Sequence, residues 1–315
     1  MPGCVMRHKR FSHDPPHDSR PFREIPTRFP ARPLLAMSPT FRLLSAVALV
    51  LLLGAPTRTQ AAELSLFDAH IHYNHDAWEV VSPREAIAFL RQAGVLRALV
   101  SSSSDDGTQK LYAEAPDLIV PELRPYRKNG ETSRWLRDES LPGYLEERLK
   151  RYRYVAIGEF HVTGADADLP VVRAVVRLAK QHGLMLHAHS DADAVERLFR
   201  QDPEARILWA HAGYEKPPRV REMLRRYQNL WAELSSRNDI APNGRLAREW
   251  QALLLEFSDR FMVGTDTFAP ERWGMIGSHA SSVRAWLAEL PMEIAERIAY
   301  KNGEAVLTAE FSKQR

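Results

Sequence analysis

Two histidines two residues apart, His70 and His72, follow the apolar run at residues 64–67. In a β-strand, residues i and i+2 point to the same face, so this spacing presents two imidazoles to one point in space. Paired nitrogen donors on a rigid element suit a borderline-soft divalent cation such as zinc. The spacing therefore predicts a metal site at the end of the first strand.

Four further strand-like segments also end in a residue that can bind a metal ion, namely Glu159, His187, His211 and Asp266. One such segment would carry little weight. Five of them, in order along the chain, predict a metal site assembled where strand ends converge, at one end of a sheet or barrel.

Strand-like and helix-like patterns alternate from residue 64 onward. Strands are predicted at residues 64–72, 95–102, 118–123, 154–162, 184–189, 206–212, 230–234 and 261–266. Helical spacing is found at residues 83–94, 135–152 with an interruption at Pro142 and Gly143, 169–182, 192–201, 218–227, 245–257, 282–290 and 293–309. This alternation predicts a parallel sheet. Eight strand–helix units in about 250 residues favour an α/β fold of the (β/α)8 TIM-barrel type, with the metal site at the C-terminal ends of the strands.

The N-terminal segment differs from the rest of the chain. Residues 1–36 are rich in Pro, Arg and His, which indicates an upstream extension before a start at Met37; an unusually long signal region is the alternative. Residues 37–61 match a secretory signal peptide with an apolar run at 43–53. That run is short for a bilayer, which takes about 20 residues to span. We therefore expect export to a periplasm, no stable membrane insertion after cleavage, and one barrel domain at residues 62–315.

Charge and cysteine content narrow the classes of function. The whole chain has a net charge of +3 and residues 1–61 carry +6, which leaves −3 for the predicted domain. A slightly acidic domain without a basic stripe argues against a nucleic-acid partner. The only cysteine, Cys4, lies in the N-terminal segment, so the domain has no disulfide, thiolate ligand or thiol nucleophile.

The ordered motifs resemble those of the amidohydrolase superfamily, a group of metal-dependent barrel hydrolases. Residues 68–72, Asp-Ala-His-Ile-His, are similar to its first-strand signature. His187, His211 and Asp266 match its fifth-strand histidine, sixth-strand histidine and eighth-strand aspartate. Residues 298–307 resemble the closing helix of the amidohydrolase-related, or family 2, branch. The resemblance covers nearly all of the predicted domain.

The fourth strand carries Glu159 where many binuclear members carry a carboxylated lysine, so that variant is excluded. A glutamate here resembles the metal-dependent deoxyribonucleases and some family 2 members, where it can bridge two metal ions. The alternative is a carboxylate that only hydrogen-bonds a ligand histidine. Apart from Asp266, Glu159 is the one strand-end carboxylate placed to bridge, with Glu233 as a weaker candidate. One ion or two is left open, with two slightly favoured.

The fifth strand offers a choice, because His187 and His189 also form an i, i+2 pair. His187 follows the apolar run at the depth expected of the metal ligand and is preferred. His189 and His161 are then predicted to face the substrate, as are Arg124 and Arg237 just beyond strand ends. In the alternative interpretation these are packing or solvated loop residues.

The resemblance implies an enzyme, an exported metal-dependent hydrolase of an amide, ester or lactone bond. A divalent metal ion, preferably zinc, would be held by His70, His72, His187 and Asp266, with Glu159 and His211 extending the site to a second ion. Asp266 is the expected general base that takes a proton from activated water, and His211 helps to hold the oxyanion.

Two alternatives stay open. Family 2 relatives include decarboxylases and hydratases of small carboxylated compounds, which need a cation such as Arg124 or Arg237 for the substrate carboxylate. A non-catalytic metal-binding barrel is disfavoured, because all six ligand-type residues are present. The expected partner is a small-molecule substrate, and a homo-oligomer is left open.

Overall fold

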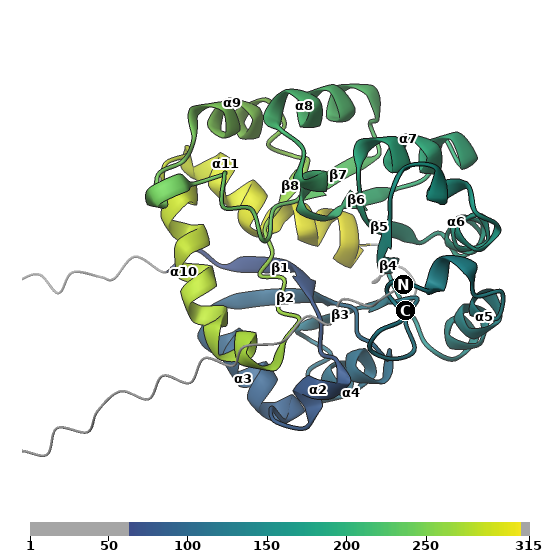
Figure 1. Ribbon diagram of the computed structural model, residues 1–315. Coiled ribbons are helices and arrows are strands. Elements are labelled where there is room, and N and C mark those ends of the chain that lie inside the picture. The colour runs from purple at the N-terminus through teal and green to yellow at the C-terminus, as the bar shows by residue number, and fades with distance from the viewer. Residues whose placement is uncertain (1–62, 310–315) are drawn as a thin grey trace, which may run out of the picture. The chain divides into compact units, whose positions relative to one another are not determined.

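The computed structural model describes residues 63–309; the predictions for residues 1–36 and 37–61 lie outside this range. Within it, eight parallel strands follow one another in chain order around a barrel. They are β1 (Leu66–Ile71), β2 (Val95–Val100), β3 (Ile119–Leu123), β4 (Ala156–Val162), β5 (Met185–Ser190), β6 (Ile207–Trp209), β7 (Leu230–Glu233) and β8 (Phe261–Met262). Figure 1 shows helices surrounding these strands. The predicted (β/α)8 barrel is confirmed.

Backbone contacts between β1 and the segment after the short strand β8 close the barrel. The N–H of His72 donates to Thr267 O at 2.8 Å, and the N–H of Asp266 donates to His70 O at 2.9 Å. The strand ends that carry the first and last candidate ligands are therefore joined directly through the main chain.

The helices form where sequence signals start and stop them. They are α2 (His75–Trp78), α3 (Pro83–Gln92), α4 (Asp106–Glu114), α5 (Leu141–Arg151), α6 (Pro170–His182), α7 (Ala192–Gln201), α8 (Pro217–Arg226), α9 (Arg248–Glu256), α10 (Ile276–Leu287) and α11 (Met292–Glu296). Helix α3 begins with a capping box in which Ser82 and Glu85 satisfy each other's backbone N–H. Helix α6 ends at Gly183, whose φ of 66° is the left-handed conformation that glycine adopts at low cost.

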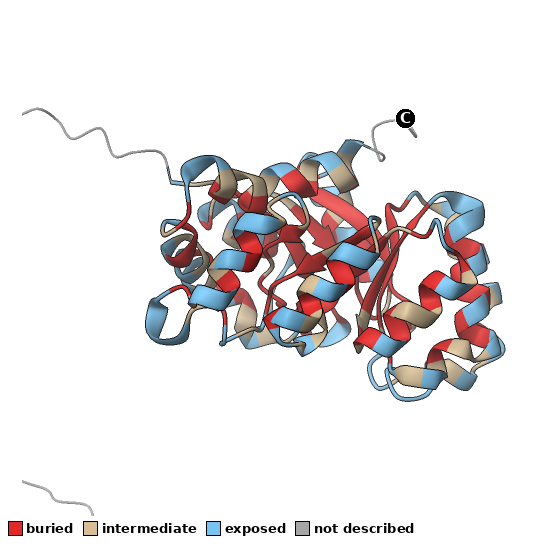
Figure 2. Ribbon diagram, turned by 90° about the horizontal axis from the view of Figure 1, so that it is seen from above, coloured by how far each residue is buried: buried red, intermediate tan, exposed pale blue. Residues whose placement is uncertain are grey.

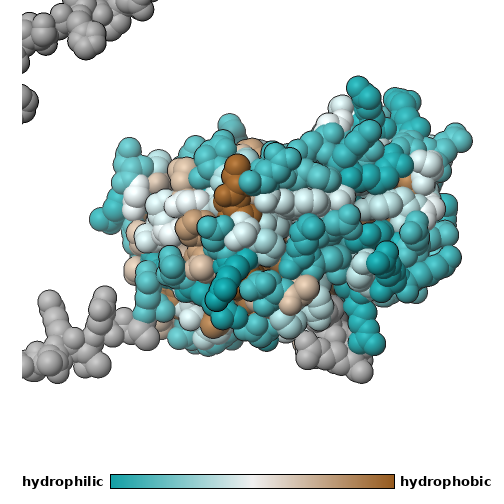
Figure 3. All heavy atoms as spheres, turned by 90° about the horizontal axis from the view of Figure 1, so that it is seen from below, coloured by the Kyte–Doolittle hydropathy of each residue, from teal (hydrophilic) through white to brown (hydrophobic). Residues whose placement is uncertain are grey.

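The core lies inside the barrel and between the strands and the helices. Figure 2 shows the strands almost wholly buried, and helices that are buried on one side and exposed on the other. Figure 3 shows a mainly hydrophilic face with scattered apolar side chains, as is usual for a protein surface. Over residues 63–309, no helix combines the length and apolar character needed to cross a bilayer.

Several local predictions differ from the structure. The helical stretch predicted at residues 135–152 is interrupted, but at residues 138–140 and not at Pro142 and Gly143: a short 3-10 turn at Trp135–Arg137 precedes α5, and Pro142 lies in the first turn of α5, where no backbone N–H is needed. The helix predicted at 293–309 is α-helical only at Met292–Glu296 and continues with π-helical turns. Helix α2 was missed, and so was helix α4. Helix α4 carries Gly107, where a Cβ would lie 1.9 Å from Tyr73 O, so packing keeps a residue of low helix propensity there. Strands β6 and β8 are shorter than expected, because the chain turns early to position the site.

Candidate metal centre

The end of β1 places two histidines side by side. His70 lies in β1 and His72 follows it, and both side chains are buried. Their Nε2 atoms are 3.0 Å apart. Two imidazole nitrogens on one tetrahedral zinc ion, each at about 2.0–2.1 Å, lie about 3.3 Å from each other. The pair is therefore spaced to share a cation.

The second ring nitrogen of each histidine has an oxygen partner that fixes the ring. Nδ1 of His70 lies 2.9 Å from Glu233 Oε2, and Nδ1 of His72 lies 2.7 Å from Ser101 O. An acceptor at Nδ1 holds the proton there and leaves the Nε2 lone pair for a metal ion. Burial, followed by the charge of Arg124, lowers the pKa of His72 to about 4, so this ring is neutral at pH 7.

Glu159 lies in the middle of the site. Its carboxylate is 3.5 Å from His70 Nε2 through Oε1 and 3.3 Å from His72 Nε2 through Oε2. It projects from β4 where the register with β5 shifts after Gly158. Only glycine fits at Gly158, since a Cβ there would lie 2.3 Å from His187 O. The glutamate thus faces the open nitrogens of both first-strand histidines.

The same carboxylate meets two further histidines on its other side. Oε1 of Glu159 lies 2.8 Å from Nδ1 of His189, on β5, and 3.7 Å from Nε2 of His211, which follows β6. Burial acts to raise the pKa of Glu159, but a positive charge on His70, from a proton that a metal ion would replace, and hydrogen bonds from His189 and His211 hold it well below its usual range. The group is an anion at neutral pH, as a carboxylate shared between cations must be.

A left-handed turn directs His211 into the barrel. His211 and Ala212 have φ angles of 54° and 47°, which non-glycine residues adopt rarely and at a cost. Nδ1 of His211 lies 3.0 Å from Ser235 O, which leaves Nε2 to face Glu159. The main chain is therefore held in an unfavourable conformation that places one imidazole nitrogen at the site.

Asp266, which follows β8, lies beside the two first-strand histidines. Its φ of 50° is also left-handed. Oδ1 lies 3.7 Å from His70 Nε2 and 3.9 Å from His72 Nε2, and Oδ2 accepts a hydrogen bond from Ser236 Oγ at 2.7 Å. One ligand atom each of His70, His72 and Asp266 lies within 4.8 Å of the others, a spacing that could hold a metal ion.

The two fifth-strand histidines lie at different depths. His187 is fully buried, with Nδ1 at 3.2 Å from Glu122 Oε2, and its Nε2 has no hydrogen-bond partner within residues 63–309. His189 is 30% exposed and contacts Glu159 directly. In the strand register Gly158 pairs with His187 and His161 pairs with His189, so Glu159 lies between the two levels. These contacts favour His189 as the nitrogen that accompanies Glu159, whereas the sequence pattern favoured His187.

The mouth of the site holds further polar groups. Arg124 donates from Nη2 to Glu159 Oε2 at 2.7 Å and from Nε to Glu159 O at 3.2 Å. The ring of His161 stacks on that of His189 with centroids 4.2 Å apart, and its Nδ1 lies 3.1 Å from the hydroxyl of Tyr126. Burial lowers the pKa of His161 to about 3, so it is a neutral side chain. Of the residues predicted to face the substrate, His189, His161 and Arg124 are brought together around Glu159.

Arg237 does not join them. It donates to His211 O at 2.9 Å and to Glu215 O at 2.8 Å, and it pairs with Asp239 at 2.7 Å. Its guanidinium lies over the ring of Trp250, 4.5 Å from the centroid. These contacts brace the loop after β7 and the backbone of His211, and none of them reaches a ligand side chain.

Two buried carboxylates of the site were underestimated from the sequence. Glu122 at the end of β3 was overlooked, and it contacts His187. Glu233 at the end of β7 was a weak candidate for want of neighbours, yet it contacts Nδ1 of His70 and accepts from the backbone N–H of Ser235. Both follow apolar strand residues, so the strand-end rule that identified Glu159 would also have found Glu122.

A family model described as Amidohydrolase matches residues 134–308, which is more than half of the chain. No match was found among curated protein sequences.

Solved structures of similar fold come from several bacteria. A putative 2-pyrone-4,6-dicarboxylic acid hydrolase of Pseudomonas putida is 14% identical with a TM-score of 0.55, over 78% of this chain and 98% of that chain. A probable 2-pyrone-4,6-dicarboxylic acid hydrolase of Acinetobacter baumannii is 13% identical with a TM-score of 0.53, over 78% and 99%. A TatD homologue of Escherichia coli is 16% identical with a TM-score of 0.52, over 77% and 98%. At these identities the likeness shows the fold.

Proposed function

Because this chain belongs to the amidohydrolase family and is a metal-dependent hydrolase, we propose that it cleaves an amide, ester or lactone bond of a small molecule. The observation that carries the proposal is the position of Glu159, a buried anion between two sets of imidazole nitrogens. This carboxylate lies at the C-terminal ends of the barrel strands, which is where this fold places its catalytic groups.

We propose two divalent cations, with zinc preferred, that share Glu159. His70, His72 and Asp266 would hold one ion, and His189 and His211 would hold the other. The fit rests on nitrogen atoms left open: the rings of His70, His72 and His211 each have the opposite nitrogen occupied by an oxygen. Neutral imidazoles with a few carboxylates are the donor set that zinc binds well.

The cations would supply a more acidic water and polarise the carbonyl of the substrate. Asp266 would take the proton from this water, a role supported by the position of Oδ1, which faces the histidines while Oδ2 accepts a hydrogen bond from Ser236. His211, fixed through Nδ1, would hold the second cation through its Nε2 lone pair, and negative charge that develops on the substrate oxygen would be stabilised by that cation. Arg124 neutralises part of the charge on Glu159 and keeps this carboxylate in place.

Decarboxylation or hydration of a carboxylated substrate has less support. Arg124 already pairs with Glu159, and Arg237 is held by Asp239 and two carbonyls, so neither cation proposed for a substrate carboxylate is free. Two of the structures with a similar fold carry names of hydrolases of a 2-pyrone, which is a cyclic ester. Lactones are therefore the first compounds to test.

We expect the purified protein, loaded with zinc, to hydrolyse at least one member of a panel of matched lactones, linear esters and amides. Removal of the metal with a chelator should abolish turnover, and addition of zinc should restore it, because the acidity of the attacking water depends on the cation. Product analysis by mass spectrometry distinguishes addition of water from loss of carbon dioxide. Turnover that survives complete metal removal would contradict the proposal.

Export remains a prediction from the sequence and is part of the proposed biology. Signal peptidase cleavage before residue 61 or 62 should give a mature protein that starts there when the chain is expressed in a Gram-negative host. N-terminal sequencing of protein from the periplasmic fraction checks this. Recovery of a chain that retains residues 43–53 in the membrane fraction would refute it.

A further inference from the structure

A cavity lies between α10 and the segments that follow β7 and β8. Its volume is about 910 Å³, within the range of small-molecule sites. Residues 234–238, 240–244 and 263–265, together with Arg272 and one side of α10, line it. No proposed metal ligand is among these residues, so the cavity is separate from the metal centre.

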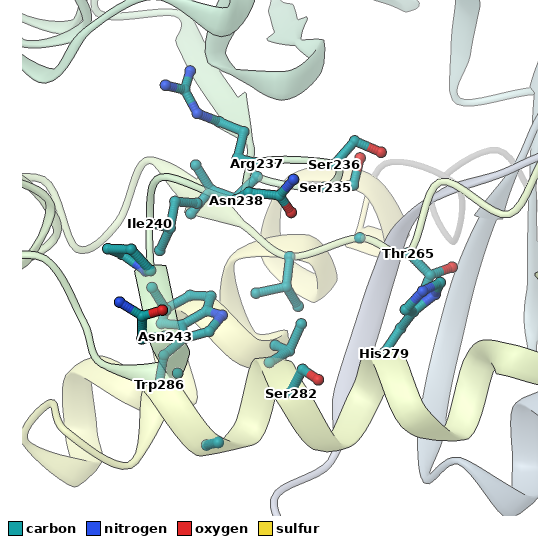
Figure 4. A pocket seen from close by; sticks show the side chains of 18 of the residues that line it. Ser235, Ser236, Arg237, Asn238, Ile240, Asn243, Thr265, His279, Ser282 and Trp286 are labelled. Atoms are coloured by element: carbon teal, nitrogen blue, oxygen red, sulfur yellow. The ribbon is translucent and has the colours of Figure 1, made fainter.

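The cavity has two chemically different ends. Figure 4 shows Thr265 and His279 at one end, and Ile240 and Trp286 at the other. The second end is mainly apolar and aromatic, with the polar Asn243 beside Trp286, and Val283 of α10 also lines the cavity. A ligand that fills it would therefore combine a polar group with a hydrophobic body.

The polar end carries positive charge without a matching acid. No Asp or Glu lines the cavity. Within residues 63–309, Nε of Arg272 and Nδ1 of His279 are buried atoms without a hydrogen-bond partner. Burial and the charge of Arg272 lower the pKa of His279, so a neutral ring lies near the guanidinium.

Arg272 is fixed in place but not neutralised. Its Nη2 donates to Thr265 O at 2.8 Å, and its guanidinium lies 5.0 Å from the ring centroid of Phe268. Among the ion pairs of residues 63–309 none involves Arg272, and its Nε has no hydrogen-bond partner there. A half-buried guanidinium with an unsatisfied N–H is costly, and a bound anion would remove that cost. The planar fork of N–H groups on arginine matches the two oxygens of a carboxylate.

We propose that this cavity binds a small organic acid, with its carboxylate on Arg272 and its apolar body against Trp286. The site goes beyond the hydrolytic reaction and would be distinct from the substrate site. Its wall is shared with the metal centre, since Ser236 lines the cavity and also hydrogen-bonds Asp266. Ser235, also in the wall, lies 3.1 Å through Oγ from Nδ1 of His211.

Calorimetric titration with 3-phenylpropionate and its neutral analogue 3-phenylpropionamide tests the proposal on the metal-loaded protein. We expect the acid to bind at least about tenfold more tightly than the amide, because only the acid can pair with Arg272. Arg272→Gln should remove this preference, and Arg272→Lys should restore part of it. Val283→Trp, which fills the cavity, should weaken both compounds.

Arg245→Gln is the matched control, because Arg245 lies in the neighbouring loop, is 84% exposed and does not line the cavity. Circular dichroism and metal content must be the same in all variants compared. Equal affinity for acid and amide, or no binding to the unmodified protein, would overturn the proposal. So would an acid preference that survives in Arg272→Gln, because that result would place the acid on the metal centre, which this variant retains.

Discussion

Replacement of His70 and His72 together by alanine is expected to deplete the purified protein of metal and to abolish measurable hydrolysis. Their Nε2 atoms lie 3.0 Å apart and are the open nitrogens of rings fixed through Nδ1. Loss of a partner that merely orients a ligand costs about 10–100-fold in metal affinity or activity. Loss of two ligands should exceed that range. Elemental analysis and turnover measurements check both effects.

The double variant should still fold, because the barrel core consists of apolar side chains on the strands and helices. Its stability should nevertheless decrease, since Glu233 would lose the imidazole at 2.9 Å and remain buried. Glu233 keeps its hydrogen bonds from Ser235 and from the backbone N–H of His211, so the loss is that of one hydrogen bond to a charged group, about 1.5–3 kcal/mol. His182→Ala is the control, because His182 is an exposed residue in the last turn of α6. Undiminished metal in the double variant would exclude both histidines as ligands.

Alanine substitutions of the two fifth-strand histidines are expected to have different effects: one should reduce metal binding and the other should reduce stability. His189→Ala should lose about one of two bound ions, because His189 is the fifth-strand imidazole in contact with Glu159. His187→Ala should keep both ions but melt at a lower temperature, since it leaves a cavity and a buried Glu122 without its partner. Metal stoichiometry and thermal unfolding, measured on both variants, give the comparison.

The reverse pattern, with metal lost in His187→Ala and retained in His189→Ala, would show that the depth inferred from the sequence was right. A wild-type protein with one ion per chain would exclude the shared-glutamate arrangement. Because the two residues lie on the same strand two positions apart, each variant serves as the control for the other.

The barrel could be predicted because its signals are local. Apolar strand runs recur at the spacing of β/α units, and the ends of α3 and α6 carry their own caps. Helix α4 was missed because its sequence meets a packing requirement at Gly107 instead of a helical preference. The periodicity of apolar residues indicates which face of a helix or strand a residue occupies. It does not indicate where two backbone segments come as close as those at Gly107 and Tyr73.

The sequence predicted which residues gather at the site, but it did not predict which of them contact each other. Depth along a strand depends on its register with the next strand, and the shift after Gly158 placed Glu159 between the levels of His187 and His189. No pattern within β4 or β5 alone contains that information. The direction of Arg237 was equally inaccessible, because it depends on carbonyl groups exposed by the turn after β6.

The main-chain closure between β1 and the residues after β8 also determines when the centre can form during synthesis. Asp68 accepts hydrogen bonds from Thr265, 197 residues further along, so β1 stays unpaired on that side until the last strand has emerged. A nascent chain that ends before β8 has both first-strand histidines but an open barrel. Contacts so distant in sequence form late in folding. If the proposed export takes place before folding, the metal supply of the destination compartment would decide which ion is loaded.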